Sequence, residues 1–243
     1  MEAKLRVRRY DPSTDGTPTY QSYAIEVAGS ATILDTLLKI REQVDGTLAF
    51  RCACRSAICG SCAMRVNGVS RLACKTKVVS VAARGQEVTV EPLANLPVIK
   101  DLVADMEPFY DKMRAVIPWL VVDPEKRLPL REYLVDAARS MQLSQYAACI
   151  QCAVCYSACP IVALDDRYLG PAALTKAFRF CHDPRDDGMA RRLARVAQEQ
   201  GLWRCHTVFS CAEQCPKAVN PTEAIQNLKR IALLRRLGLG RKA

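Results

Sequence analysis

The residues best suited to chemistry in this sequence are its 13 cysteines, most of which lie in three short groups. The first group has the spacing C-x₄-C-x₂-C, and a fourth cysteine follows it at a distance. This pattern is typical of [2Fe–2S] sites, in which four thiolates hold two irons. We therefore predict a [2Fe–2S] cluster bound by Cys54, Cys59, Cys62 and Cys74. A zinc site is the alternative, but zinc sites usually combine two C-x₂-C pairs, and no second pair lies nearby.

The second and third groups resemble each other. The second is a complete C-x₂-C-x₂-C-x₃-C-P run, and the third repeats this run with one cysteine missing. In two-cluster proteins the fourth cysteine of such a run ligates the other cluster. This crossing rule predicts a [4Fe–4S] cluster on Cys149, Cys152, Cys155 and Cys215. It leaves only three thiolates for the other cluster, namely those of Cys159, Cys205 and Cys211.

Val208 stands where the third group lacks its cysteine. An aliphatic side chain cannot ligate iron, so one corner of a four-iron cube would have no protein ligand, and a [3Fe–4S] cluster is expected. A [4Fe–4S] cluster with one labile iron, or a zinc site, would be the alternatives. His206 adjoins Cys205 and could hydrogen-bond an acceptor or pass a proton, although a purely structural role is an alternative.

The amino-acid composition favours a metal-binding protein over a disulfide-bonded or nucleic-acid-binding one. The odd number of cysteines and their tight spacing fit metal-bound thiolates in a reducing compartment better than disulfides. Cys52 and Cys181 remain outside the ligand scheme, and we expect both to be buried apolar residues. The formal net charge is +10, but the basic residues are spread along the whole chain and aromatic residues make up only 6%. Nucleic-acid binding is therefore not expected. Neither a secretory signal nor a membrane-spanning stretch is predicted.

Two segments with different periodicities must position the cysteines. Residues 1–100 show alternating apolar residues near positions 5–10, 23–27 and 88–90, a helix over 32–40, and Asn67-Gly68 as a type I′ hairpin turn. From about residue 96 strand signals end, and helices are expected over 101–117, 129–150, 171–182, 188–200 and 221–237. We predict an α+β chain: a β-grasp plant-type [2Fe–2S] ferredoxin domain (1–100), then an all-α bacterial-ferredoxin-like domain (101–243).

With these motifs in this order, the chain resembles the iron–sulfur subunit of succinate dehydrogenase and fumarate reductase. The resemblance extends over nearly the whole chain. Besides the cysteine groups, it rests on Leu96–Leu102 between the domains, Gly170-Pro171-Ala172-Ala173, Arg179-Phe180 with Asp183, and Asn220-Pro221 after the last cysteine.

The resemblance implies an electron-transfer subunit of a succinate:quinone oxidoreductase. Electrons would pass from the FAD of a partner flavoprotein through [2Fe–2S], [4Fe–4S] and [3Fe–4S] to a membrane quinone, with Pro160 and His206 near the quinone. It also implies one or more membrane anchor subunits, which can carry haem b, and a peripheral location on the cytoplasmic side of the plasma membrane. No catalytic residues for succinate chemistry are expected on this chain.

Three points stay open. Many succinate:ubiquinone enzymes carry a tryptophan pair after the first cubane run, but this chain has Ile161-Val162-Ala163-Leu164 there. No tryptophan contact to quinone is therefore carried over, and the fumarate-reducing direction is an alternative. A zinc-structured interaction protein without redox chemistry is a further alternative. Finally, we expect the last helix to pack onto the helical domain through its apolar residues Ile225, Leu228 and Ile231. Contact of its basic residues with lipid headgroups is a further hypothesis.

Overall fold

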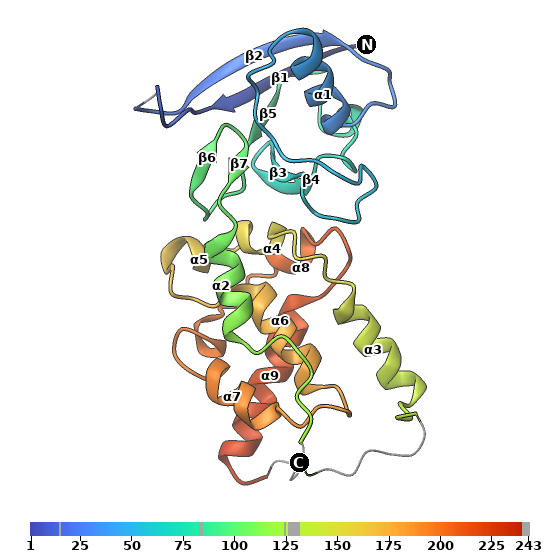
Figure 1. Ribbon diagram of the computed structural model, residues 1–243, viewed down its shortest axis with the longest axis vertical. Helices are drawn as coiled ribbons and strands as arrows, with labels where there is room; N and C mark the ends of the chain where they lie inside the picture. Colours follow the sequence, from blue (N-terminus) through green and yellow to red (C-terminus); the bar gives the residue numbers. More distant parts are fainter. Residues whose placement is uncertain (15, 83–84, 124, 126–131, 240–243) are drawn as a thin grey trace. The chain divides into compact units, whose positions relative to one another are not determined.

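The described part of the chain forms two compact units. The computed structural model describes residues 1–14, 16–82, 85–123, 125 and 132–239 (Figure 1). One unit comprises Met1–Glu107 together with Ile150–Ala158, and the other comprises Pro108–Cys149 and Cys159–Ala243. The short segment 150–158 therefore belongs to the N-terminal unit although it lies far along the sequence.

A five-stranded sheet in the order β2-β1-β5-β3-β4 forms the centre of the first unit. β1 pairs with β2 antiparallel and with β5 parallel, while β3 pairs antiparallel with both β4 and β5. The strands are β1 (Glu2–Arg9), β2 (Thr19–Glu26), β3 (Ala63–Val66), β4 (Val69–Leu72) and β5 (Val88–Glu91). This mixed sheet, with a helix packed on it, confirms the predicted β-grasp arrangement.

The core of the first unit follows from the alternation of its strands. Leu5 and Val7 of β1 are fully buried, whereas their neighbours along the strand point away from the core. Helix α1 (Ile33–Gln43) buries one apolar face in the same core. Thr32 caps this helix: its hydroxyl accepts the Asp35 N–H at 3.1 Å, and the Asp35 carboxylate accepts the Thr32 N–H at 2.9 Å. This capping box fixes the start of the helix predicted over residues 32–40.

The hairpin that leads to Cys74 forms as predicted. Asn67 and Gly68 join β3 to β4, and both have positive φ angles, +50° and +76°, as a type I′ turn requires. A 3₁₀ turn, η1 (Val78–Ser80), follows after the return strand.

The prediction that strand structure ends near residue 96 is wrong. Two short strands, β6 (Val98–Lys100) and β7 (Val103–Ala104), pair with each other around Asp101. The buried Asp101 carboxylate accepts bonds from Arg9 Nε at 3.0 Å and from the Ala49 N–H at 2.8 Å. These partners lie 52 or more residues away, so local periodicity could not reveal the hairpin. Helix α2 (Glu107–Ala115) consequently begins later than the predicted residue 101.

In the described residues of the second unit, all regular secondary structure is helical. The helices are α2, α3 (Ala137–Ala147), α5 (Pro160–Leu164), α6 (Gly170–Cys181), α7 (Met189–Val196), α8 (Ser210–Glu213) and α9 (Pro221–Arg236), with a 3₁₀ turn η3 (Leu202–Arg204). Helix α6 is buried along most of its length and packs against α9 (Figure 1). The predicted helix over 129–150 is shorter, because α3 starts after its Asp136 cap; residues 129–131 lie outside the described residues.

A buried ion pair fixes the chain between α2 and α7. Arg192 and Asp186 are both fully buried, and Arg192 Nη2 donates to the Asp186 carboxylate at 2.9 Å. Arg192 Nε also donates to the Ile117 carbonyl at 2.9 Å, so this guanidinium bonds both a carboxylate and backbone carbonyl groups. The described chain after α2 is thereby held against α7.

The cysteines and the histidine that were left outside the ligand scheme are packed within the fold. Cys181 is 3% exposed, which confirms it as a core residue. Cys52 is partly buried and packs against the core of the first unit. His182 is half-buried: it stacks on Phe178, with ring centroids 5.2 Å apart, and hydrogen-bonds Gln142 at 2.6 Å.

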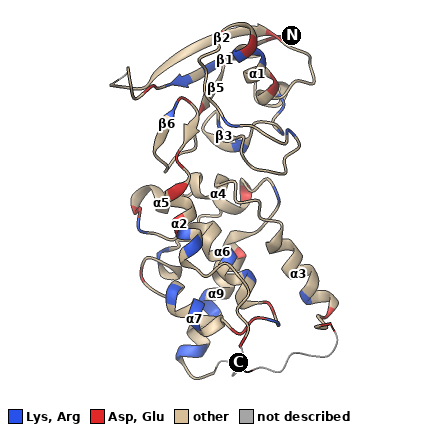
Figure 2. Cartoon of the chain, in the orientation of Figure 1, with Lys and Arg blue, Asp and Glu red and all other residues tan. Residues whose placement is uncertain are grey.

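Positive charge occurs in both units, as expected, with a group of basic residues on α7 and along α9 (Figure 2). Ile225 and Leu228 of α9 are fully buried, so this helix packs onto its own unit as predicted. Lys229 bonds the carbonyl of Cys205 at 2.9 Å rather than pointing freely outward. None of the helices in the described ranges is both long and apolar enough to span a bilayer.

Candidate functional site

The four cysteines of the first group all lie in the first unit. Cys54 and Cys59 lie on a loop, Cys62 lies just before β3, and Cys74 follows β4. Three residues of this loop adopt positive φ angles: Arg55 (+55°), Ala57 (+56°) and Gly60 (+75°). Such a conformation is sparsely populated for residues other than glycine and is found mainly where a site requires it. The loop turns sharply and repeatedly, as a chain that wraps a small group must.

Backbone N–H groups converge on the sulfurs of this loop. Cys54 Sγ accepts bonds from the N–H groups of Ser56, Ile58 and Cys59 at 3.3–3.4 Å. Cys74 Sγ accepts the N–H of Ala57 at 3.3 Å. These donors lower the pKa of the Cys54 thiol to about 6, because they stabilise the thiolate. Iron binds the thiolate form, so the loop fits an iron–sulfur cluster.

The segment 150–158 packs directly against this loop. A Cβ atom added to Gly60 would lie only 2.7 Å from Cβ of Cys152, so the two backbones are in close contact. Ser157 fixes the segment further: its hydroxyl lies 2.8 Å from Ser70 Oγ and accepts the Ala94 N–H at 2.8 Å. Cys152, predicted to bind the [4Fe–4S] cluster, is thus held beside the first cysteine loop.

The two cubane-type runs share one backbone conformation. In the first run, Gln151 and Ala153 have positive φ angles of +54° and +60°, and helix α4 (Val154–Ser157) follows. In the second run, Thr207 and Phe209 have φ angles of +60° and +67°, and α8 follows in the same way. Val208 therefore occupies the position that Cys152 occupies in the first run.

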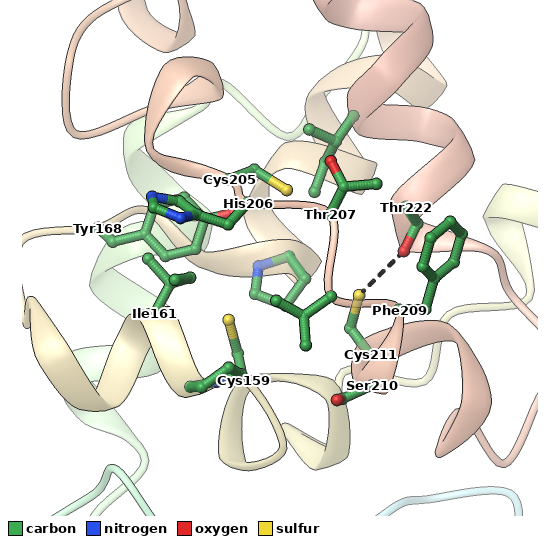
Figure 3. Close-up of a pocket in the computed structure, with 14 residues that line it drawn as sticks. Cys159, Ile161, Tyr168, Cys205, His206, Thr207, Phe209, Ser210, Cys211 and Thr222 are labelled. Atoms are coloured by element: carbon green, nitrogen blue, oxygen red, sulfur yellow. Dashed lines mark hydrogen bonds between the residues drawn. The ribbon is translucent and has the colours of Figure 1, made fainter.

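Cys159, Cys205 and Cys211 surround one pocket of the second unit, which is partly open to solvent. Their sulfurs point into it from three sides (Figure 3). Pro160, His206 and Val208 line the same pocket. The structure thus brings together the three predicted ligands, the two residues expected near quinone and the position of the missing ligand.

The remaining predicted ligands divide between the units. Cys152 and Cys155 belong to the first unit, whereas Cys149 and Cys215 belong to the second. Each is partly buried. Their assignment to one [4Fe–4S] cluster stays a prediction of the crossing rule.

Two hydroxyl groups at the three-cysteine pocket were not predicted from the sequence. Tyr168 is buried and lines the pocket together with Cys205, and Thr222 Oγ1 lies 3.4 Å from Cys211 Sγ. Burial raises the pKa of Tyr168, and the neighbouring cysteines raise it further. The only signal in the sequence is position, because Tyr168 precedes the Gly170-Pro171 motif and Thr222 follows Asn220-Pro221.

Polar groups also stabilise the backbone and the thiolates of this pocket. The N–H groups of Val162 and Ile161, at the start of α5, hydrogen-bond Cys159. Gln226 donates to Thr207 Oγ1 at 2.9 Å, which fixes the loop that carries Val208. Burial nevertheless raises the pKa of the Cys159 and Cys211 thiols, since an isolated thiolate is poorly solvated there. Bound iron would stabilise these buried thiolates through its positive charge.

Comparison with known proteins identifies the chain's relatives. Residues 4–111 match the family of 2Fe-2S iron–sulfur cluster binding domains, and residues 145–219 match the 4Fe-4S dicluster domain. The chain is 42% identical over 225 residues to a fumarate reductase iron–sulfur subunit of Mycobacterium tuberculosis, covering 93% of this chain and 90% of that one. It belongs to this family of iron–sulfur subunits. The corresponding subunit of Haemophilus influenzae is 36% identical over 235 residues, with 93% and 91% coverage.

A solved structure agrees with this assignment. A chain of the Mycobacterium smegmatis Sdh1 complex in its apo form matches with a TM-score of 0.86 and 28% identity, covering 97% of both chains. The predictions of an electron-transfer subunit of the succinate dehydrogenase and fumarate reductase family, and of its fold class, are confirmed. So are the [2Fe–2S] and [4Fe–4S] cofactors, and a [3Fe–4S] cluster is the third cluster typical of such subunits.

The arrangement of the cysteines fits clusters of several irons. Within the described residues, no three His, Cys, Asp or Glu side chains converge on a point where a single metal ion could bind. A polynuclear cluster does not need such convergence, because its thiolates bind different irons. Cys54, Cys59, Cys62 and Cys74 would hold the first cluster, and Cys159, Cys205 and Cys211 line the space for another.

Proposed function

We propose that this chain connects the FAD of a partner flavoprotein with a membrane quinone, in a succinate:quinone oxidoreductase. The clusters supply one-electron chemistry, and the chain positions them in the order [2Fe–2S], [4Fe–4S], [3Fe–4S]. Relatives named as subunits of fumarate reductase and of an Sdh1 complex support membership of such an assembly. Membrane anchor subunits, with or without haem b, would hold the chain at the cytoplasmic side of the membrane.

One observation carries the cluster assignment. The two cubane-type runs have the same pattern of positive φ angles and the same one-turn helix, so their residues can be matched one to one. Cys152 in the first run corresponds to Val208 in the second. Val208 lines the pocket with Cys159, Cys205 and Cys211 and offers no ligand atom. A cluster with three protein ligands, [3Fe–4S], is what this donor set supports.

The order of the first two clusters rests on the contact between Gly60 and Cys152. Gly60 lies between the ligands Cys59 and Cys62, and its backbone touches Cys152, a predicted ligand of the [4Fe–4S] cluster. The [2Fe–2S] and [4Fe–4S] sites are therefore neighbours in the proposed relay. His206 and Pro160 line the three-thiolate pocket, which supports placing the quinone at this end.

The same relay serves either direction of electron flow. Electrons run from succinate to quinone or from quinol to fumarate according to the potentials of the two couples. No residue for proton or hydride chemistry on succinate is needed on this chain, because that reaction belongs to the flavoprotein partner in this proposal.

Val208→Cys tests the assignment directly. We expect the oxidised wild-type complex to give a [3Fe–4S] electron paramagnetic resonance signal that disappears on reduction. In Val208→Cys that signal should be largely lost and replaced by a second [4Fe–4S] signal in the reduced complex, because the fourth corner gains a thiolate.

Thr207→Cys is the matched control. It introduces a thiol one residue away, at the position that Gln151 occupies in the first run, and should leave the [3Fe–4S] signal in place. Two [4Fe–4S] clusters already present in the wild type, together with no change in Val208→Cys, would refute the ligand assignment.

A further inference from the structure

Two buried hydroxyl side chains lie at the three-thiolate pocket. Tyr168 is 1% exposed and lines this pocket together with Cys205. Thr222 is 4% exposed, and its Oγ1 lies 3.4 Å from Cys211 Sγ. Figure 3 shows both side chains at the edge of the pocket, on different elements. Two buried hydroxyl groups thus lie beside the predicted ligands, one of them within hydrogen-bond distance of Cys211.

The backbone holds both hydroxyls in place. The Tyr168 N–H donates to the Asp165 carbonyl at 3.1 Å, and the Tyr168 carbonyl accepts Lys112 Nζ at 2.9 Å. Thr222 lies in the first turn of α9, where the side chain of Asn220 caps the helix by accepting the Glu223 N–H at 3.1 Å. Both hydroxyl side chains are therefore carried by backbone that hydrogen bonds hold in place.

The direction of a hydrogen bond between either hydroxyl and a ligand sulfur follows from the chemistry of the ligands. A cysteine that binds iron is a thiolate and has no proton to donate. The hydroxyl must then be the donor and the sulfur the acceptor in both pairs. A hydrogen bond to an anionic acceptor in a water-poor site is stronger than a bond between neutral groups.

We propose that Tyr168 and Thr222 raise the reduction potential of the cluster held by Cys159, Cys205 and Cys211 by donating hydrogen bonds to the sulfurs of Cys205 and Cys211. Reduction adds one electron and breaks no bond, and both hydroxyl protons stay on their oxygens. The added negative charge strengthens each hydrogen bond, so the reduced cluster gains more stability than the oxidised one. A higher potential at this end of the relay favours the arrival of electrons from the neighbouring cluster.

This inference rests on the proposed assignment of a [3Fe–4S] cluster to these three cysteines. A purely structural role for the hydroxyls is the competing explanation. The two explanations differ in one readout: loss of a structural bond lowers stability, whereas loss of a bond to a ligand sulfur also lowers the midpoint potential.

The experiment is a redox titration of the purified complex, followed through the [3Fe–4S] resonance signal. Tyr168→Phe and Thr222→Val each remove a hydroxyl and keep the shape of the side chain. We expect each to lower the one-electron equilibrium constant for reduction about tenfold, which is a fall of about 59 mV in midpoint potential. The double variant should show the larger shift.

Two matched controls remove buried hydroxyls of the same unit whose hydrogen-bond partners are groups other than cysteine. Tyr146→Phe removes a hydroxyl that bonds Glu223, and Thr175→Val removes one that donates to the Pro171 carbonyl at 2.7 Å. Both should leave the midpoint potential unchanged, although they lower thermal stability.

The outcomes separate the two proposals. A wild-type complex without a [3Fe–4S] signal would overturn the proposed function itself. An intact signal with an unchanged potential in Tyr168→Phe and Thr222→Val would overturn only the role of the hydroxyls. If Tyr168→Phe fails to assemble the cluster, Thr222→Val decides: a lowered potential supports the inference and an unchanged one refutes it.

Discussion

At the scale of single residues, Gly60 is the most constrained position of the first cysteine loop. Its φ angle is +75°, and an added Cβ would lie 2.7 Å from Cβ and 3.1 Å from Cα of Cys152. Gly60→Ala should therefore destabilise the folded loop in two ways. The unfavourable backbone angle costs about 1–2 kcal/mol, and overpacking against Cys152 costs about 1–3 kcal/mol more. We expect early loss of the visible circular dichroism of the [2Fe–2S] cluster during urea unfolding of the complex.

Gly68→Ala separates these two effects. Gly68 has nearly the same φ angle, +76°, but its nearest neighbour would be the flexible end of Arg65 at 3.8 Å. Only the backbone contribution should remain, so Gly68→Ala should be clearly milder than Gly60→Ala. Equal loss of stability in both variants would show that the contact with Cys152 is unimportant.

At the scale of elements, helix α4 depends on a buried serine. Ser157 closes α4, and its hydroxyl bonds Ser70 of β4 and the N–H of Ala94. Ser157→Ala would leave the partly buried Ala94 N–H without this partner, at a cost of about 1 kcal/mol or more. The segment that carries Cys152 and Cys155 should then loosen. We expect faster loss of the [4Fe–4S] resonance signal in the presence of an iron chelator.

Ser80→Ala, in the 3₁₀ turn η1, is the control variant for Ser157→Ala. Ser80 is exposed and donates only to the Lys77 carbonyl at 2.7 Å within its own turn. Its replacement should leave the rate of cluster loss at the wild-type value. A Ser157→Ala complex as resistant to the chelator as the wild type would contradict the role given to α4.

At the scale of the whole molecule, the ligand scheme fixes the metal content. Clusters of the [2Fe–2S], [4Fe–4S] and [3Fe–4S] types together contain about nine irons per chain. Elemental analysis of the purified complex, corrected for iron in any haem, should approach this value and show little zinc. Zinc in amounts comparable to iron would instead support the alternative assignment, a zinc site at one of the cysteine groups.

Much of the fold could be predicted because its determinants are local. Alternating apolar residues specify β1, Asn67-Gly68 specifies the β3–β4 turn, and Thr32 specifies the start of α1, each within a few residues. The β6–β7 hairpin could not be predicted in this way. It forms around Asp101, whose partners Arg9 and Ala49 come from distant parts of the chain.

The sequence by itself determined the number and kind of the clusters, because thiolate spacing along the chain reflects how far a short loop can reach around iron and sulfide. It also predicted Val208 as the position of the missing ligand. Only the tertiary structure decided that residues 150–158 pack with the N-terminal unit and that Tyr168 and Thr222 line the pocket of the three predicted ligands. Those contacts join residues far apart in sequence, and a hydroxyl side chain has no spacing rule that would reveal its partner in advance.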